Sequence, residues 1–318
     1  MFRLPLIVVA ALFLLPAHAA DPPKCKLARI AEWPVRFQSN QPIIDGEING
    51  KKVAVLIDTG AMFTMVQTAA AEKLDLPLQL TGQRALGFGG EARVYMTTIE
   101  ELRIGDAVRK GMRVRVTGER ATRNFDMLLG DDFFKQTELE FDYANNVVRL
   151  FQAFDCKGAR LSYWDANALE LPLEDDRQVV IAITVNGRPA RALIDSGAFA
   201  SVVTTRFAAT IGITPQSPGV TEGGCSGGIG GNPVRNWIAT FDSVAIAGEA
   251  IRDAKLRIAD FMSEFAHTAR ERPEVVLGTD FLRAHRVLVS RTQGKMYFSY
   301  AGGVVFDAPR GRPCPAGN

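Results

Sequence analysis

The sequence predicts a mainly β protein built from two homologous halves. The stretch VLIDTGAMFTMV at Val55–Val66 returns 137 residues later as ALIDSGAFASVV at Ala192–Val203. An Asn-Gly pair precedes each stretch at the same spacing, between runs of alternating apolar residues, and this is the strongest short-range signal for a β-hairpin. A repeat of this length indicates a duplicated domain and not a solenoid.

The first 19 residues differ from the rest of the chain. Arg3 is followed by an apolar run and then by Ala17-His18-Ala19, which has the small-residue pattern of a cleavage site. Together these features predict a secretory signal peptide over residues 1–19. An uncleaved membrane anchor is the alternative. The run is short for a bilayer span, however, and no second apolar segment of about 18 or more residues follows it. We therefore expect a periplasmic or extracellular protein without a stable membrane span.

The charge of the chain argues against a polyanionic partner. Removing residues 1–19 takes away one arginine and no acid, so the formal net charge falls from +2 to +1. No block of lysine and arginine stands out, so we expect no nucleic-acid binding.

All four cysteines follow the predicted cleavage site, and an even number in an oxidising compartment favours two disulfides. Three connectivities are open. Cys25 and Cys156 bracket the first half of the chain, so we predict that pair, with Cys225–Cys314 as the other. None has the C-x-x-C spacing of a zinc site, and no metal or other cofactor is expected.

Each half is expected to run through the same elements. A hairpin ends in the aspartate-containing turn, and a short helix, a glycine-rich tip, a pair of strands, an apolar-Gly-x-Asp segment and two final strands follow. In the first half the helix, tip, strand junction and apolar-Gly segment are Gln67–Leu74, Leu86–Tyr95, Ile104-Gly105 and Met127–Phe134. In the second half they are Thr205–Ile211, Gly227–Asn236, Ala247-Gly248 and Val275–Leu282.

The repeat lapses at roughly residues 152–176, so we place the domain boundary there. The prediction is a first domain over residues 20–155 and a second over residues 156–318. Residues 20–42 precede the first hairpin and are either a strand or a removable peptide.

The two acidic turns are the candidate site. A single D-[ST]-G tripeptide is weak support, because an ordinary turn explains an Asp that caps the backbone and a Gly that supplies a positive φ. Duplication of the scaffold explains the repeated apolar positions. It gives less reason to keep Asp58 and Asp195 at the ends of buried strands, where an unpaired charge is costly. Two facing acids that share a proton would explain why both aspartates are kept.

At these turns the chain resembles the aspartic proteases. The form D-[TS]-G-A-x-x-[ST]-x-V is closer to the retropepsin-like branch than to pepsin, and the resemblance spans nearly all of residues 43–300. It implies a bilobal acid-protease fold of two β-barrel lobes related by pseudo-two-fold symmetry. It also implies that Asp58 and Asp195 are catalytic, that hydroxyls join the turns, that glycines keep them open, and that two flaps cover the substrate. The implied turn-support residues are Thr59, Gly60, Ser196 and Gly197, and the implied flap residues are Phe88, Gly89, Ile229 and Gly230.

This resemblance implies a peptide hydrolase. Two carboxyl groups about 3 Å apart cannot both ionise, so one stays protonated and the pair titrates as a unit. The ionised member would activate a water and the protonated member would polarise the peptide carbonyl. We expect a monomeric endopeptidase acting on extended peptides with bulky apolar side chains. Ala61 and Ala198 replace the serine common in pepsins, which predicts a mildly acidic to near-neutral optimum.

No other catalytic set competes well. His267 and His285 lack H-E-x-x-H spacing and accompany no G-x-S-x-G, so we interpret them as a surface and a packing residue. Asp132 and Asp280 recur in the two halves outside the acidic turns, and we interpret them as structural. Two alternatives stay open at this point: a peptide-binding module that has lost turnover, and lobes that pair with those of a second chain.

Overall fold

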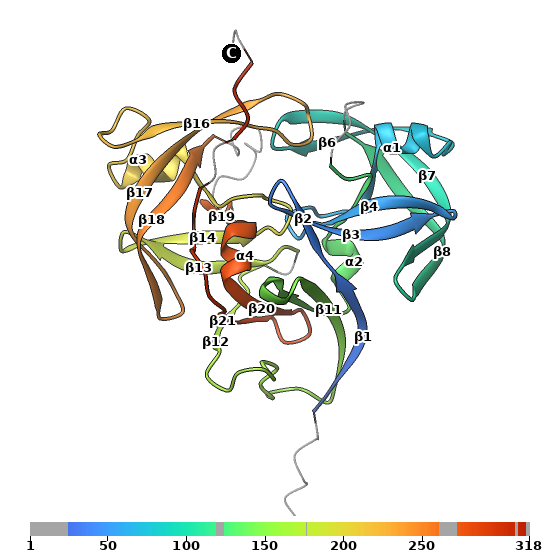
Figure 1. Cartoon of the computed structure of the whole chain (residues 1–318), viewed down its shortest axis with the longest axis horizontal. Helices are drawn as coiled ribbons and strands as arrows, with labels where there is room; N and C mark the ends of the chain where they lie inside the picture. The colour runs from blue at the N-terminus through green and yellow to red at the C-terminus, as the bar shows by residue number, and fades with distance from the viewer. Residues whose placement is uncertain (1–24, 119–123, 176, 261–271, 309–310, 316–318) are drawn as a thin grey trace, which may run out of the picture.

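The computed structural model describes residues 25–118, 124–175, 177–260, 272–308 and 311–315. The predicted signal peptide and His267 lie outside these residues. The chain is mainly β, with two barrels side by side and a third sheet between them (Figure 1). No helix in the described ranges is long and apolar enough to cross a membrane.

An eight-stranded sheet contains most strands of the first half of the chain. Its strand order is β2-β3-β4-β9-β5-β8-β7-β6, and a further pairing between β3 and β7 closes six of the strands into a barrel. The strands are β2 (Arg36–Gln38), β3 (Gln41–Ile48), β4 (Lys51–Ile57), β5 (Met65–Gln67), β6 (Gln79–Gly87), β7 (Gly90–Ile104), β8 (Ala107–Thr117) and β9 (Met127–Leu129).

A seven-stranded sheet repeats this topology in the second half. Its order is β13-β14-β19-β15-β18-β17-β16, and β13 also pairs with β17 to close the barrel. The strands are β13 (Val180–Val185), β14 (Arg188–Ile194), β15 (Val202–Thr204), β16 (Thr221–Ser226), β17 (Val234–Ile246), β18 (Glu249–Ala259) and β19 (Val275–Leu277). The predicted fold class, two homologous β-barrel lobes, is confirmed.

The Asn-Gly hairpins are confirmed in both halves. Asn49 and Gly50 have φ of 50° and 76°, and Asn186 and Gly187 have 48° and 74°. Two successive residues with positive φ make the turn whose twist matches that of the flanking strands. Each Asn side chain also accepts a backbone N–H from the strand that closes its barrel, from Glu101 of β7 in the first half and from Ser243 of β17 in the second.

Four short α-helices accompany the sheets: α1 (Thr68–Lys73), α2 (Asp131–Phe134), α3 (Thr205–Thr210) and α4 (Thr279–Ala284). The first and third agree with the predicted helices to within one residue at each end. The other two begin directly after Gly130 and Gly278, inside the apolar-Gly segments, and were not predicted. They span four and six residues, which is too short for a helical period to show in the sequence.

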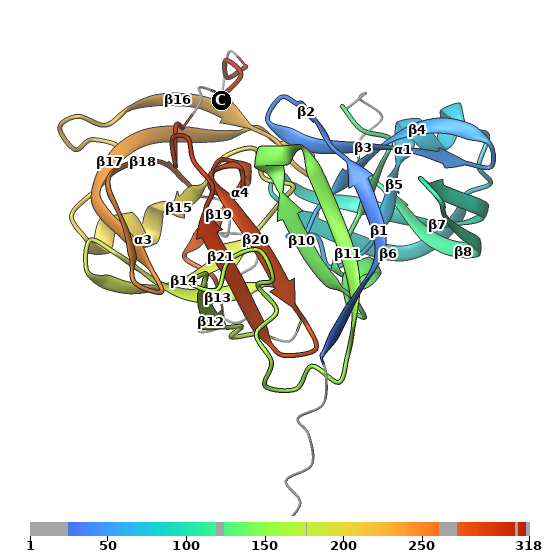
Figure 2. The same ribbon diagram turned by 60° about the horizontal axis from the view of Figure 1, so that its bottom comes forward.

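A six-stranded sheet joins the halves, in the order β1-β11-β10-β20-β21-β12 (Figure 2). Its centre is the antiparallel pairing of β10 from the first half with β20 from the second. The strands are β1 (Lys26–Pro34), β10 (Glu138–Asp142), β11 (Val147–Phe154), β12 (Leu169–Pro172), β20 (His285–Ser290) and β21 (Lys295–Tyr300), and the 3₁₀ turn η1 (Tyr143–Asn145) links β10 to β11. Of the two interpretations of residues 20–42, the described part forms strands. The predicted division at residues 155 and 156 falls directly after β11.

Buried charge crosses this joint. Glu140 is fully buried on β10 and accepts hydrogen bonds from Arg149 at 2.7 Å and from Arg286 of the other half at 3.0 Å. An unpaired carboxylate there would be strongly destabilising, so the pairing fixes how the halves meet.

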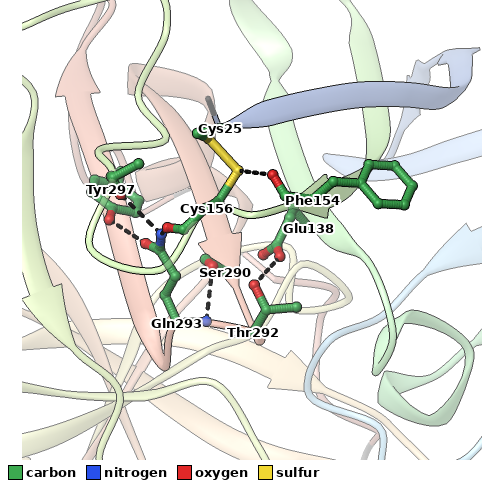
Figure 3. The surroundings of a disulfide bond; sticks show 9 residues. Cys25, Glu138, Phe154, Cys156, Ser290, Thr292, Gln293 and Tyr297 are labelled. Atoms are coloured by element: carbon green, nitrogen blue, oxygen red, sulfur yellow. Dashed lines mark hydrogen bonds between the residues drawn. A yellow bond between two sulfur atoms is a disulfide. The ribbon is translucent and has the colours of Figure 1, made fainter. Parts of the chain in front are cut away.

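Both predicted disulfides form. Cys25–Cys156 ties the start of β1 to the segment after β11, and the Gln293 side chain donates to the carbonyl of Cys156 at 2.6 Å (Figure 3). Cys225–Cys314 ties β16 to the C-terminal segment.

Candidate active site

Two strand ends deliver the aspartates to the middle of the molecule. Asp58 follows β4 and Asp195 follows β14, and each of these strands pairs in parallel with the short strand of the apolar-Gly segment. The backbone N–H of Asp58 donates to Leu129 O at 3.0 Å, and that of Asp195 donates to Leu277 O at 2.9 Å. Each turn is therefore anchored to the core of its own barrel.

The hydroxyl residues of the two turns bond across the halves. Thr59 Oγ1 donates to Ile194 O at 2.7 Å, and Ser196 Oγ donates to Ile57 O at 2.8 Å. Each hydroxyl oxygen also accepts the backbone N–H of the other residue at 3.1 Å. Both side chains are buried, so water does not compete for these bonds. The reciprocal pattern holds the two turns against each other.

Glycine at the next position allows the carboxyl groups to approach. A Cβ on Gly60 would lie 2.3 Å from Cγ of Asp195, and a Cβ on Gly197 would lie 2.4 Å from Cγ of Asp58. Real Cβ atoms do not tolerate such contacts, so no larger residue fits either position without moving the opposite acid. The structure thus brings Asp58 and Asp195 together in one chain, with each carboxyl group lying against the glycine of the opposite turn.

Burial and mutual repulsion shift the acidity of the pair. Burial, followed by the charge of Asp195, holds the pKa of Asp58 well above its ordinary value. Burial also raises the pKa of Asp195, against the opposing effect of its hydrogen bond with Asp58. The turns supply donors that favour the charged form: Gly60 N and Ala61 N lie 3.1 and 3.0 Å from Asp58 Oδ1, and Gly197 N and Ala198 N lie 2.9 and 3.1 Å from Asp195 Oδ1. This environment favours one proton held between two oxygens.

The second pair of repeated acids is structural, as interpreted from the sequence. Asp132 Oδ1 accepts from the backbone and the hydroxyl of Thr64 at 2.7 and 2.8 Å, and Asp280 accepts from the same groups of Ser201. Each hydroxyl in turn accepts the N–H of the packing glycine, Gly130 or Gly278. These contacts brace the loop after each acidic turn. Burial raises the pKa of Asp280 to about 6.

The predicted flap tips contact each other, and each packs against the barrel of the other half. Gly89 N donates to Ile229 O at 2.7 Å, and Asn232 N donates to Gly89 O at 3.0 Å. Phe88 packs against an apolar cluster of the second barrel that includes Ala198, and Ile229 packs against a cluster of the first barrel that includes Ala61. Each tip therefore packs on the barrel of the opposite half, and Gly230 packs tightly on Gly89 and Gly90.

Two glutamines near the turns were missed by the sequence analysis. Gln178 Nε2 donates to Gly60 O at 3.0 Å, and Gln41 Nε2 donates to Gly197 O at 2.8 Å. Their separation of 137 residues equals that of the aspartates, so the repeat itself carried a signal that could have found them.

The remaining candidates do not join the site. His285 is buried, stacks on Phe281 and contacts Phe281 O and Glu249, which confirms its interpretation as a packing residue. Among the described residues no group of three or more His, Cys, Asp and Glu side chains is placed to hold a metal ion.

Comparison with known families agrees with this arrangement. Residues 44–136 match the family described as gag-polyprotein putative aspartyl protease, and residues 180–281 match the family described as aspartyl protease. Together the two matches cover more than half of the chain and place one domain in each barrel. The chain belongs to the aspartyl proteases and carries two retropepsin-like domains in tandem.

Among curated proteins the chain is similar to the UBA domain-containing protein Mud1 of Schizosaccharomyces pombe. The identity is 32% over 110 residues, which is 34% of this chain and 32% of that protein. The similarity thus covers about a third of either molecule.

Proposed function

We propose that the chain is an aspartic endopeptidase in which Asp58 and Asp195 form the catalytic dyad. The observation that carries the proposal is the close approach of the two carboxyl groups, each of which lies against a glycine of the opposite half where no Cβ would fit. Membership of the aspartyl proteases supports the peptide bond as the target.

The dyad would act by acid and base catalysis together. One proton is shared, so one carboxyl group is ionised and the other is not. The ionised group takes a proton from a water bound between them, and the resulting nucleophile attacks the peptide carbonyl. The protonated group donates to the carbonyl oxygen, and a proton then passes to the leaving nitrogen. Because neither step needs a metal, the chain's own residues are sufficient.

The substrate would be an extended peptide with apolar side chains beside the cleaved bond. The tips carrying Phe88 and Ile229 rest on apolar clusters next to the two turns, and a peptide entering there would lift the tips and replace them on the same surfaces. Apolar side chains recover the burial that the tips give up. With both acids on one chain, a monomer would be sufficient for catalysis.

An oxidising location fits the same proposal. The two disulfides persist best outside the cytoplasm, and the first 19 residues have the pattern of a secretory signal peptide. We propose a periplasmic or extracellular enzyme.

Cleavage of casein and of a diverse peptide library by the purified protein tests the proposal. We expect Asp58→Asn and Asp195→Asn each to lower kcat by about 10²–10⁴-fold, because an amide can neither hold nor accept the shared proton. Asp106→Asn makes the same chemical change on an exposed turn and should retain activity. A wild-type protein that cleaves nothing between about pH 3 and 8, yet binds a peptide that mimics the tetrahedral intermediate, would instead be a peptide-binding module.

A further inference from the structure

The two glutamines beside the acidic turns contact the opposite halves of the molecule. Gln41 begins β3 in the first barrel and reaches Gly197 O in the second, whereas Gln178 precedes β13 in the second barrel and reaches Gly60 O in the first. Both side chains are half-buried. The contact is therefore made twice, in the same sense, by residues that occupy equivalent positions of the repeat.

Each glycine carbonyl belongs to a peptide group whose other end faces a carboxyl group. The carbonyl of Gly60 shares its peptide plane with the N–H of Ala61, and that N–H donates to Asp58 Oδ1 at 3.0 Å. Likewise the carbonyl of Gly197 shares its plane with the N–H of Ala198, which donates to Asp195 Oδ1 at 3.1 Å. A hydrogen bond at the carbonyl end polarises the peptide group and strengthens donation at the N–H end.

We propose that Gln41 and Gln178 are positioning residues for the dyad, each heading a relay that runs from its side-chain amide through one peptide group to the carboxylate of the opposite half. The inference rests on the proposed function. The relay has two effects: it fixes the plane of the peptide group that aims at the carboxylate, and it stabilises the ionised form. Ala61 and Ala198 have no polar side chain, so their backbone N–H groups are the donors that these two positions supply.

Several charged groups lie near the two glutamines and the dyad. The dyad members face each other. On the Gln178 side, Arg291 donates to the backbone carbonyl of Gln178 and pairs with Asp131. On the Gln41 side, Arg283 donates to Asn40, and Arg257 lies over the ring of Phe199. None of these contacts uses the side-chain amide of Gln41 or Gln178, so a change in titration of the dyad in a glutamine variant would report on the amide donor.

Replacing each glutamine by methionine preserves the shape of the side chain and removes the donor. We expect Gln41→Met and Gln178→Met each to lower kcat by about three- to tenfold with little change in KM. The acid limb of the pH–rate profile should move up by about half a pH unit, because weaker donation to the ionised form raises the pKa of the pair. Gln→Arg at either position retains an N–H donor. In these variants the acid limb of the pH–rate profile should lie at the wild-type pH or at a lower pH.

Gln38→Met is the matched control, because Gln38 is exposed on the neighbouring strand of the same hairpin as Gln41. Titration of the aspartate carboxyl carbons by NMR, assigned with Asp58→Asn and Asp195→Asn, measures the same shift without requiring turnover. Variants that unfold at lower temperature but keep the wild-type titration and pH profile would show a purely structural role and overturn the relay. If wild type has no activity, the proposed function fails, and the NMR titration still decides the relay.

Discussion

At the scale of single residues, the site depends on what small side chains permit. Gly60 and Gly197 leave room for the opposite carboxyl groups, and Thr59 and Ser196 place one hydroxyl each in the buried contact between turns. The turns, joined by these hydroxyl bonds, hold the two acids close together. Removing a hydroxyl should therefore affect stability and catalysis together.

Thr59→Val tests this coupling. The substitution preserves the shape of the side chain but leaves Ile194 O and the N–H of Ser196 without their partner, and each unsatisfied group costs about 1–3 kcal/mol. We expect a lower free energy of unfolding in urea and a lower kcat. Thr240→Val on the exposed face of β17 should change neither quantity. Full stability of Thr59→Val would mean that the hydroxyl bonds do not hold the turns.

Asp280 gives the protein a pH-dependent stability. Burial raises its pKa from 3.8 to about 6, so the folded state binds more protons than the unfolded state between those values. The contribution of this group to stability is complete below the unfolded pKa and is lost as the pH rises through the folded pKa. We expect the melting temperature of Asp280→Asn to change less than that of wild type between about pH 4 and 6. Parallel curves for the two proteins would contradict the raised pKa.

At the scale of elements, the two flap hairpins are held differently. The C-terminal segment runs along β16, where Cys225 N donates to Arg312 O and Gly311 N donates to Gly223 O, both at 2.8 Å. The Cys225–Cys314 disulfide makes this contact covalent, whereas the first flap has no disulfide among the described residues. The second flap should therefore open less readily than the first.

Hydrogen exchange measures this difference. In Cys225→Ser/Cys314→Ser, we expect faster amide exchange across β16 and the second flap tip, because the segment that covers β16 is no longer tied to it. Exchange in the first flap strand β6 should stay close to wild type. Cys25→Ser/Cys156→Ser removes a disulfide far from the flaps and is the control. Unchanged exchange in β16 would show that the backbone hydrogen bonds alone restrain the hairpin.

The sequence predicted those elements whose signals are local. Asn49-Gly50 and Asn186-Gly187 specify their hairpins without help from the rest of the chain, and the helix after each acidic turn was placed to within a residue. The contacts of Gln41 and Gln178, and the exchange of the flap tips, depend on how the two barrels meet. That arrangement arises from pairing between distant strands, which no local pattern records.

At the scale of the whole molecule, the duplicated chain supplies both halves of one site. The β10–β20 pairing and the buried Glu140 with Arg149 and Arg286 join the barrels, and the acidic turns bond across the same joint. This geometry argues against the alternative in which each lobe pairs with that of a second chain. Nothing about catalysis should then depend on protein concentration.

Mixing the two single variants tests directly whether the working site forms within one chain. Peptide cleavage is measured for wild type, for Asp58→Asn, for Asp195→Asn, and for an equimolar mixture of the two variants refolded together. We expect that wild type cleaves, that each variant is slower by about 10²–10⁴-fold, and that the mixture is no faster than the variants because every chain carries one damaged dyad. Recovery of activity in the mixture would mean that the working site forms between chains, and activity close to wild type in either single variant would mean that the two acids do not share the reaction.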